Sequence, residues 1–198
     1  SAASDVYKRQ DMDYQYSPLE VIGGKIYLFT NHGAPKNRIM VADLAKSELK
    51  DWTELVPESE AVLSGAQVIG GKLFLTYDKD ASNHAYVYGL DGKQLQEIKL
   101  PSLGTVGFSG DKDDKECFFS FTSFTIPGAT YKYDMDKNTY ELFRAPKVDF
   151  DADAFVTEQV FYSSKDGTKI PMFLTYKKDL KKDGTNPVYL YGYGGFNI

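Results

Sequence analysis

Short runs of apolar and aromatic residues alternate with polar residues along most of the chain, and one such run recurs. Residues 21–30 read VIGGKIYLFT, and residues 68–77 read VIGGKLFLTY, so the second copy begins 47 residues after the first. A weaker third copy, DDKECFFSFT, stands at 113–122. An apolar–polar alternation of period two is typical of β-strands with one buried face. The Gly-Gly-Lys step inside the first two copies favours a tight hairpin, because glycine readily adopts positive φ.

Each copy is followed by a second alternating run that ends near an acidic residue, and shorter runs close the later units. The second runs are 38–43, 85–91 and 130–134, and the closing runs are 94–100 and 139–143. This spacing predicts four-stranded propeller blades, with an ordinary antiparallel sheet of chance similarity as the alternative. Because closed propellers need about 4–8 blades, three units lead us to expect further chain before residue 11.

The repeat stops near Pro146, and a different pattern follows an acidic stretch. Residues 158–164 and 169–176 are predicted to be strands on either side of a turn at 165–168. Residues 187–191 form a short apolar run, which predicts a fully buried strand. Hardly any helix is expected, so the fold class is mostly β.

Composition and charge exclude several classes of function. The net charge is −5 and no basic block is present, which argues against a nucleic-acid partner. No run approaches the roughly 18 apolar residues that span a bilayer. Residues 1–10 have no apolar core, so they are not a signal peptide, and we leave them unassigned as a non-native or truncated start. Cys117 is the only cysteine, which fits a reducing compartment; we expect a cytoplasmic location and leave a periplasmic one open.

The glycine cluster that follows 187–191 is the main candidate site. Open sheets hold ligands beyond the carboxyl ends of their strands, and glycines let the backbone approach a reacting group. A tyrosine hydroxyl there can donate a hydrogen bond to a developing oxyanion. On these local grounds a tight turn at a strand end remains the alternative. The cluster is not a dinucleotide fingerprint, because Asn197 stands where a third glycine is required.

Other candidate chemistry is weak. No Gly-x-Ser-x-Gly elbow occurs; residues 107–111 come nearest, fail at the last position and are expected in a turn between units. His32 and His84, the only histidines, are expected in equivalent loops as solvated residues. Histidine, cysteine and carboxylates do not cluster at ligand spacing, so we expect no metal. Residues 111–114 are expected to be a solvated turn and not a calcium loop.

The run 190–198, LYGYGGFNI, resembles the segment of prolyl oligopeptidases that opens the catalytic half of their hydrolase domain. The similarity extends through 164–173 and the lysine pair at 177–178, and 121–128 resembles a motif late in that family's propeller. The resemblance implies a seven-bladed β-propeller that caps an α/β-hydrolase domain. Residues 11–147 would then form about three of the last blades, and residues 148–198 would begin the catalytic domain.

The resemblance also implies roles for residues of the glycine cluster. Tyr193 corresponds to the tyrosine whose hydroxyl helps to form the oxyanion hole, and Phe196 to an apolar wall near the substrate proline. The residues that would support this loop are Tyr191, Gly192, Gly194, Gly195 and Asn197. In the family the nucleophilic Ser, the triad Asp and the triad His all follow this motif. We therefore expect none of the three in this chain, and no hydrolytic activity from the chain alone.

The activity implied is that of a serine endopeptidase that cleaves short peptides on the carboxyl side of proline, by acyl transfer and without a cofactor. The expected partners of the whole protein are short proline-containing peptides, and the whole protein is expected to be a monomer. Two alternatives stay open: a non-catalytic propeller that binds ligands, and a related oligopeptidase that prefers basic residues. Sequence beyond Ile198 would distinguish these possibilities.

Overall fold

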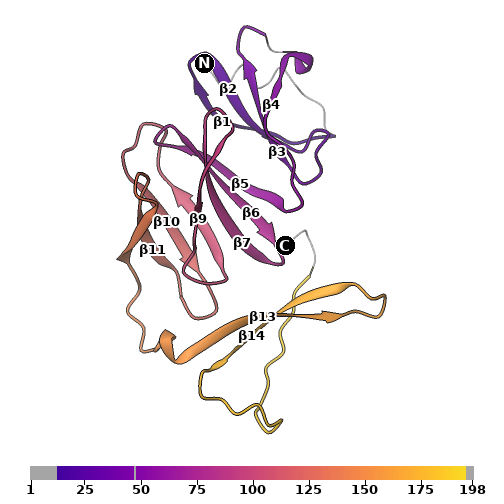
Figure 1. The fold of residues 1–198 in the computed structure, drawn as a ribbon, viewed down its shortest axis with the longest axis vertical. Helices are drawn as coiled ribbons and strands as arrows, with labels where there is room; N and C mark the ends of the chain where they lie inside the picture. The colour runs from indigo at the N-terminus through magenta and orange to yellow at the C-terminus, as the bar shows by residue number, and fades with distance from the viewer. Residues whose placement is uncertain (1–12, 47, 195–198) are drawn as a thin grey trace.

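A computed structural model describes residues 13–46 and 48–194, and they form a mostly β structure (Figure 1). Three four-stranded sheets follow one another along the chain and are succeeded by a two-stranded hairpin. The only helices in the described ranges are two 3-10 turns, η1 (Leu49–Asp51) and η2 (Ala152–Ala154). No helix in these ranges is long and apolar enough to cross a membrane.

Each sheet is an antiparallel meander whose strands are hydrogen-bonded in chain order. Sheet 1 consists of β1 (Tyr16–Ile22), β2 (Lys25–Thr30), β3 (Arg38–Asp43) and β4 (Thr53–Val56). Sheet 2 consists of β5 (Val62–Ile69), β6 (Lys72–Lys79), β7 (Ser82–Gly89) and β8 (Gln94–Ile98). Sheet 3 consists of β9 (Thr105–Ser109), β10 (Cys117–Thr122), β11 (Ala129–Asp134) and β12 (Thr139–Arg144). The prediction of three repeated four-stranded units from the sequence pattern is therefore confirmed at the level of the sheets.

The Gly-Gly steps form the tight hairpins that were predicted. The φ angles are +57° and +77° at Gly23 and Gly24, and +55° and +70° at Gly70 and Gly71. Two consecutive positive φ values characterise the turn type whose twist matches paired strands. The turn of sheet 2 is also docked on its neighbour, because the Gly70 and Gly71 amides donate to the carbonyls of Asp111 (3.0 Å) and Lys112 (2.9 Å). The glycines therefore serve both the hairpin and the junction between sheets 2 and 3.

The core lies between successive sheets. In β6, Leu73 and Leu75 belong to a buried cluster shared with sheet 1, whereas Phe74 belongs to a cluster shared with sheet 3. Consecutive side chains of a strand point to opposite faces, so one central strand contributes to both interfaces. The sheets are consequently packed face to face, as successive blades of a propeller are. Figure 1 shows sheet 1 at the top, sheet 2 in the centre and sheet 3 at the left.

The hairpin that follows sheet 3 was also predicted. It consists of β13 (Phe155–Ser163) and β14 (Lys169–Lys177), with all nine residues of each strand in antiparallel register. The turn closes where the Ser164 amide donates to the Thr168 carbonyl at 2.9 Å. Pro171 pairs with Phe161 in this two-stranded sheet, where a residue without an N–H is tolerated because both strands are edges.

The prediction of a buried strand at 187–191 is wrong for this structure. No strand is present there, and Val188, Tyr189 and Leu190 are 86%, 89% and 82% exposed. A strand exists only when a neighbour accepts its backbone hydrogen bonds, and no described residue pairs with this segment. The apolar run therefore identified residues that would be stabilised by burial, but it could not specify a neighbouring strand to pair with them.

Candidate functional site

The glycine loop predicted to carry the oxyanion donor is described as far as Gly194. Tyr191 and Tyr193 are 73% and 64% exposed, and a Cβ atom at Gly192 or Gly194 would meet nothing within 4 Å. Gly195, Phe196 and Asn197 lie outside the described residues. In the part of the chain that the structure describes, no side chain converges on the Tyr193 hydroxyl. The roles inferred for this loop consequently remain predictions.

The two histidines lie in different settings. His32 follows β2, and its Nδ1 lies 2.5 Å from the Tyr16 hydroxyl, with the Tyr14 ring centroid 4.3 Å from its own. His84 lies within β7, opposite Tyr77, so the prediction of a loop was wrong there. A tight turn at Asp80 and Ala81 lets strand pairing start at Ser82. The two histidines thus do not occupy equivalent positions, and the His32 ring packs against two tyrosines.

Two further sequence expectations concern strands and metals. Residues 107–109, expected in a turn between units, belong to β9, because Gly107 pairs with Ser120 in the ladder of sheet 3. No group of three or more His, Cys, Asp or Glu side chains suited to a metal ion occurs among the described residues.

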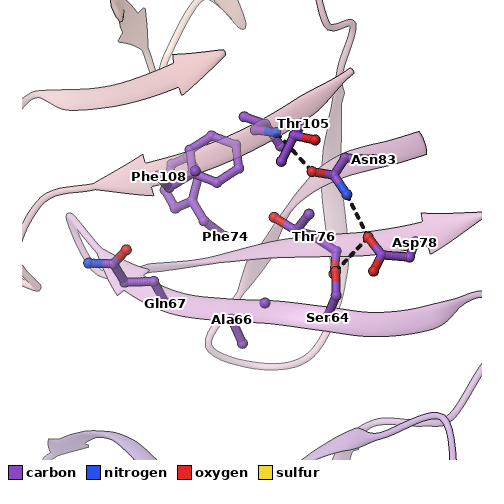
Figure 2. Close-up of a pocket in the computed structure, with 12 residues that line it drawn as sticks. Ser64, Ala66, Gln67, Phe74, Thr76, Asp78, Asn83, Thr105 and Phe108 are labelled. Carbon is purple, nitrogen blue, oxygen red and sulfur yellow. Dashed lines mark hydrogen bonds between the residues drawn. The ribbon is translucent and has the colours of Figure 1, made fainter. Parts of the chain in front are cut away.

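A cleft of about 410 Å³ lies between sheets 2 and 3. We call it the inter-sheet cleft. Its walls are β5 and β6 on one side and β9 on the other, with the start of β7 at one end (Figure 2). The residues that line it are Ser64, Gly65, Ala66, Gln67, Phe74, Thr76, Asp78, Asn83, Thr105, Val106, Gly107 and Phe108. None of these residues was predicted from the sequence to form a binding site.

Asn83 joins the two sheets at one end of the cleft. Its backbone N–H donates to the Gly104 carbonyl at 3.0 Å, and its Oδ1 accepts from the Val106 amide at 2.8 Å. Its Nδ2 donates to Asp78 Oδ1 at 2.5 Å. A single side chain therefore satisfies the buried amide of Val106 in sheet 3 and a carboxylate of sheet 2.

Asp78 is engaged through one oxygen. Ser64 Oγ donates to Oδ1 at 2.9 Å, the same atom that accepts from Asn83 (Figure 2). Within the described ranges no hydrogen bond or ion pair reaches Oδ2, and the side chain is exposed at the mouth of the cleft. The carboxylate is therefore held in place by its neighbours while half of its acceptor capacity faces outward.

The remainder of the cleft is less polar. The rings of Phe74 and Phe108 lie with centroids 5.1 Å apart. Gly65 leaves β5 without a side chain beside Thr76 of the cleft lining. At the far end, Gln67 Nε2 donates to the Gly110 carbonyl at 2.9 Å, which joins the sheets a second time. The cleft is thus lined by polar and apolar residues in about equal measure, with polar bridges between the sheets at both ends.

The mouth of the cleft lies beside the β13–β14 hairpin. Asp80, two residues after Asp78, accepts a hydrogen bond through its backbone carbonyl from Gln159 Nε2 of β13. Asp80 and Ala81 have φ angles of +50° and +61°, values that are unfavourable for residues other than glycine. The strained turn that carries the mouth of the cleft therefore also contacts the hairpin.

The sequence and fold of the chain match those of known proteins. The family model described as the prolyl oligopeptidase N-terminal beta-propeller domain matches residues 5–146. The chain belongs to the prolyl oligopeptidase family. The family resemblance stated from residues 190–198, 164–173, 177–178 and 121–128 is therefore confirmed at family level.

Individual relatives of the family agree with this assignment. The chain is 42% identical over 187 residues to the prolyl endopeptidase of Elizabethkingia meningoseptica, which covers 94% of the chain and 26% of that protein. It is 36% identical over 194 residues to prolyl oligopeptidase A of Galerina marginata, again 94% of the chain and 26% of the relative. The chain thus spans about a quarter of the length of the curated relatives it matches.

Solved structures of the family have the same fold over this region. One from a study of two prolyl endopeptidases superposes with a TM-score of 0.85 at 38% identity, covering 96% of this chain and 28% of that one. Prolyl oligopeptidase B of Galerina marginata, bound to a 35mer substrate, gives a TM-score of 0.83 at 30% identity over 94% of this chain and 27% of that one. Oligopeptidase B of Leishmania major is 18% identical with a TM-score of 0.75, covering 90% of this chain and 27% of that one, so it supports the fold alone.

Proposed function

We propose that the chain is part of a serine endopeptidase that cleaves short peptides on the carboxyl side of proline. The observation that carries this proposal is the extent of the match to a prolyl endopeptidase. An alignment of 187 residues is longer than the propeller match over 5–146. Because it covers 94% of the chain, it includes the residues of the β13–β14 hairpin that follow the three sheets.

Within this proposal the two segments of the chain belong to different domains of the whole protein. Residues 11–147 contribute blades of a seven-bladed propeller, and residues 148–198 begin the α/β-hydrolase domain. The nucleophile and its partners belong to other parts of the whole protein, where they would carry out acyl transfer. The Tyr193 hydroxyl donates a hydrogen bond to the oxyanion, Phe196 borders the proline pocket, and Tyr191, Gly192, Gly194, Gly195 and Asn197 shape the loop.

The test uses the whole protein that contains this chain and a pair of chromogenic peptides that differ only in having proline or alanine before the scissile bond. We expect hydrolysis of the proline peptide and little of the alanine peptide. Tyr193→Phe removes one oxyanion donor, so kcat should fall by about 10²–10³ with little change in KM. Tyr189→Phe, in the same exposed segment, is the matched control and should leave kcat unchanged.

Other outcomes would identify the alternatives. Preferential cleavage after lysine or arginine would indicate the related oligopeptidase, and binding without any hydrolysis would indicate a non-catalytic propeller. The 198-residue chain alone is expected to be inactive; turnover that survives repurification and disappears in Tyr193→Phe would contradict this. The expectations of a monomeric, cytoplasmic protein without a cofactor, metal, nucleic-acid or membrane partner stay predictions.

A further inference from the structure

We propose that the inter-sheet cleft is an accessory site for an extended peptide, in which Asp78 binds an ammonium group of that peptide. This inference rests on the proposed function, because it takes a peptide as the ligand. It adds a site in the propeller, formed between sheets 2 and 3, that is separate from the oxyanion loop.

The first argument is the unused oxygen of Asp78. Both hydrogen bonds to this carboxylate, from Ser64 and Asn83, end on Oδ1, and within the described ranges none ends on Oδ2. No Lys or Arg in these ranges lies within salt-bridge distance of Asp78. Eight ion pairs are present among the other described residues. A fixed anion with an outward-facing oxygen is complementary to the amino terminus or lysine side chain of a peptide.

The second argument is the backbone on both walls. β5 and β9 are the end strands of sheets 2 and 3, so no described strand pairs with the outer edge of either, although the Leu63 amide there donates to Lys36 and the Val106 amide to Asn83. Such edges bind extended peptides through main-chain hydrogen bonds. Gly65 lies on β5 beside Thr76 of the cleft lining, and its missing side chain lets another backbone come close.

The third argument is the size and the lining. A volume of about 410 Å³ lies within the roughly 300–1,000 Å³ typical of ligand sites, which combine an apolar lining with a few polar groups. Phe74, Phe108 and Val106 supply apolar lining, and Asp78 and Asn83 at the mouth are two of the six polar residues among the twelve that line the cleft. This combination favours a peptide over a small anion, because the cleft offers no basic side chain.

The fourth argument is the position of the mouth. The turn that follows Asp78 contacts the hairpin through Asp80 and Gln159. A peptide bound by its ammonium group at Asp78 would therefore lie next to the segment with which the catalytic domain is proposed to begin. We infer that the cleft raises the affinity for peptides that carry such a group at a suitable distance from the proline.

The experiment uses the whole protein and three octapeptides with one central proline. One has a free amino terminus, one is N-acetylated, and one is N-acetylated with a lysine at its first position. An exposed ion pair contributes about 0.2–1 kcal/mol. We therefore expect a KM up to about fivefold lower for peptides with an ammonium group, with kcat unchanged. The acetylated lysine peptide distinguishes a side chain from an amino terminus as the bound group.

Asp78→Asn should remove this preference, because the amide keeps the oxygen that accepts from Ser64 and Asn83 but has no charge. Asp78→Glu should retain it in part, which guards against a loss caused by misfolding. Asp91→Asn, an exposed carboxylate at the β7–β8 turn of the same sheet, is the control and should keep the full preference. Equal preference in wild type and Asp78→Asn, or none in wild type, would overturn the proposal.

Failure of the proposed function would look different. If no peptide is hydrolysed, calorimetric binding of the same three peptides with alanine in place of proline still tests the cleft. Tighter binding of the ammonium-bearing peptides by wild type than by Asp78→Asn supports the cleft, and equal binding refutes it.

Discussion

The ring of Phe124, in the loop between β10 and β11, lies 5.6 Å from the ring of Phe173 in β14, measured between centroids. Phe124 is 65% exposed to solvent. The contact joins sheet 3 to the hairpin, and the hydrogen bond from Gln159 to the Asp80 carbonyl joins sheet 2 to it. Two loops from different sheets thus hold the hairpin at one end of the three-sheet unit.

The Phe124–Phe173 contact should be measurable as a coupling energy. An aromatic pair contributes about 0.5–1.5 kcal/mol beyond its buried area. A double-mutant cycle with Phe124→Ala and Phe173→Ala, followed by urea unfolding of the whole protein, should give a coupling in this range. The pair Phe143→Ala and Phe173→Ala is the control, since Phe143 contacts Phe118 within sheet 3. A coupling indistinguishable from that control would show that the hairpin is held by other contacts.

Two glycines with the same backbone conformation should differ in their tolerance of alanine. Gly23 and Gly70 both have positive φ, but a Cβ atom meets nothing within 4 Å at Gly23. At Gly70 it would lie 2.7 Å from Met135 Cε and 2.8 Å from the Asp114 carbonyl oxygen. Gly23→Ala should cost about 1–2 kcal/mol from the left-handed conformation alone. Gly70→Ala should cost about 1–3 kcal/mol more, because a backbone atom must also move.

Thermal and urea unfolding of both glycine variants in the whole protein measures this difference. Equal losses of stability would mean that the junction between sheets 2 and 3 relaxes freely around the added methyl group.

The bridge made by Asn83 should be costly to remove. Asn83→Ala leaves the buried Val106 amide without its acceptor, and an unsatisfied buried group costs about 1–3 kcal/mol. Asn186→Ala removes a solvent-exposed hydrogen bond from the side-chain amide to the Lys181 carbonyl, and it should cost much less. Urea unfolding of the two variants compares them. The prediction is wrong if Asn83→Ala is as mild as the control.

Cys117 should be unreactive in the folded protein. Burial, with a smaller contribution from Asp114, raises the pKa of its thiol to about 12. At pH 8 the reactive thiolate would then be only about one part in ten thousand. Labelling with a thiol reagent at pH 8, read by mass spectrometry of the peptide that contains Cys117, should be slow until denaturant is added. Fast labelling of the native protein would contradict the burial of this side chain.

The same thiol makes stability depend on pH in the alkaline range. The unfolded state releases the proton near the ordinary pKa of 9.0, whereas the folded state keeps it until about 12. The unfolded state therefore binds fewer protons between these values, and stability falls as pH rises through this window. The free energy of unfolding of Cys117→Ala should decline less from pH 8 to pH 10 than that of wild type, and an identical decline would exclude this origin.

Local patterns were sufficient wherever a feature depends on neighbours in the chain. The Gly-Gly hairpins at Gly23 and Gly70 follow from backbone freedom, and the β13–β14 hairpin follows from alternation around a turn, so both were predicted from the sequence. The repeat of the VIGGK motif predicted three equivalent units. The motifs at 121–128, 164–173 and 190–198 identified the family, because several of them occur in the family's order along the chain.

Tertiary structure alone decided the features that depend on residues distant in the sequence. The stretch 187–191 has the apolar character of a buried strand, but a strand forms only beside a partner, which its own residues cannot specify. The inter-sheet cleft, likewise, was invisible in the sequence, since Ser64, Asp78 and Asn83 match no motif. They meet because hydrophobic burial stacks sheet 2 on sheet 3, and that packing brings Asn83 to the Val106 amide while an oxygen of Asp78 is left facing outward.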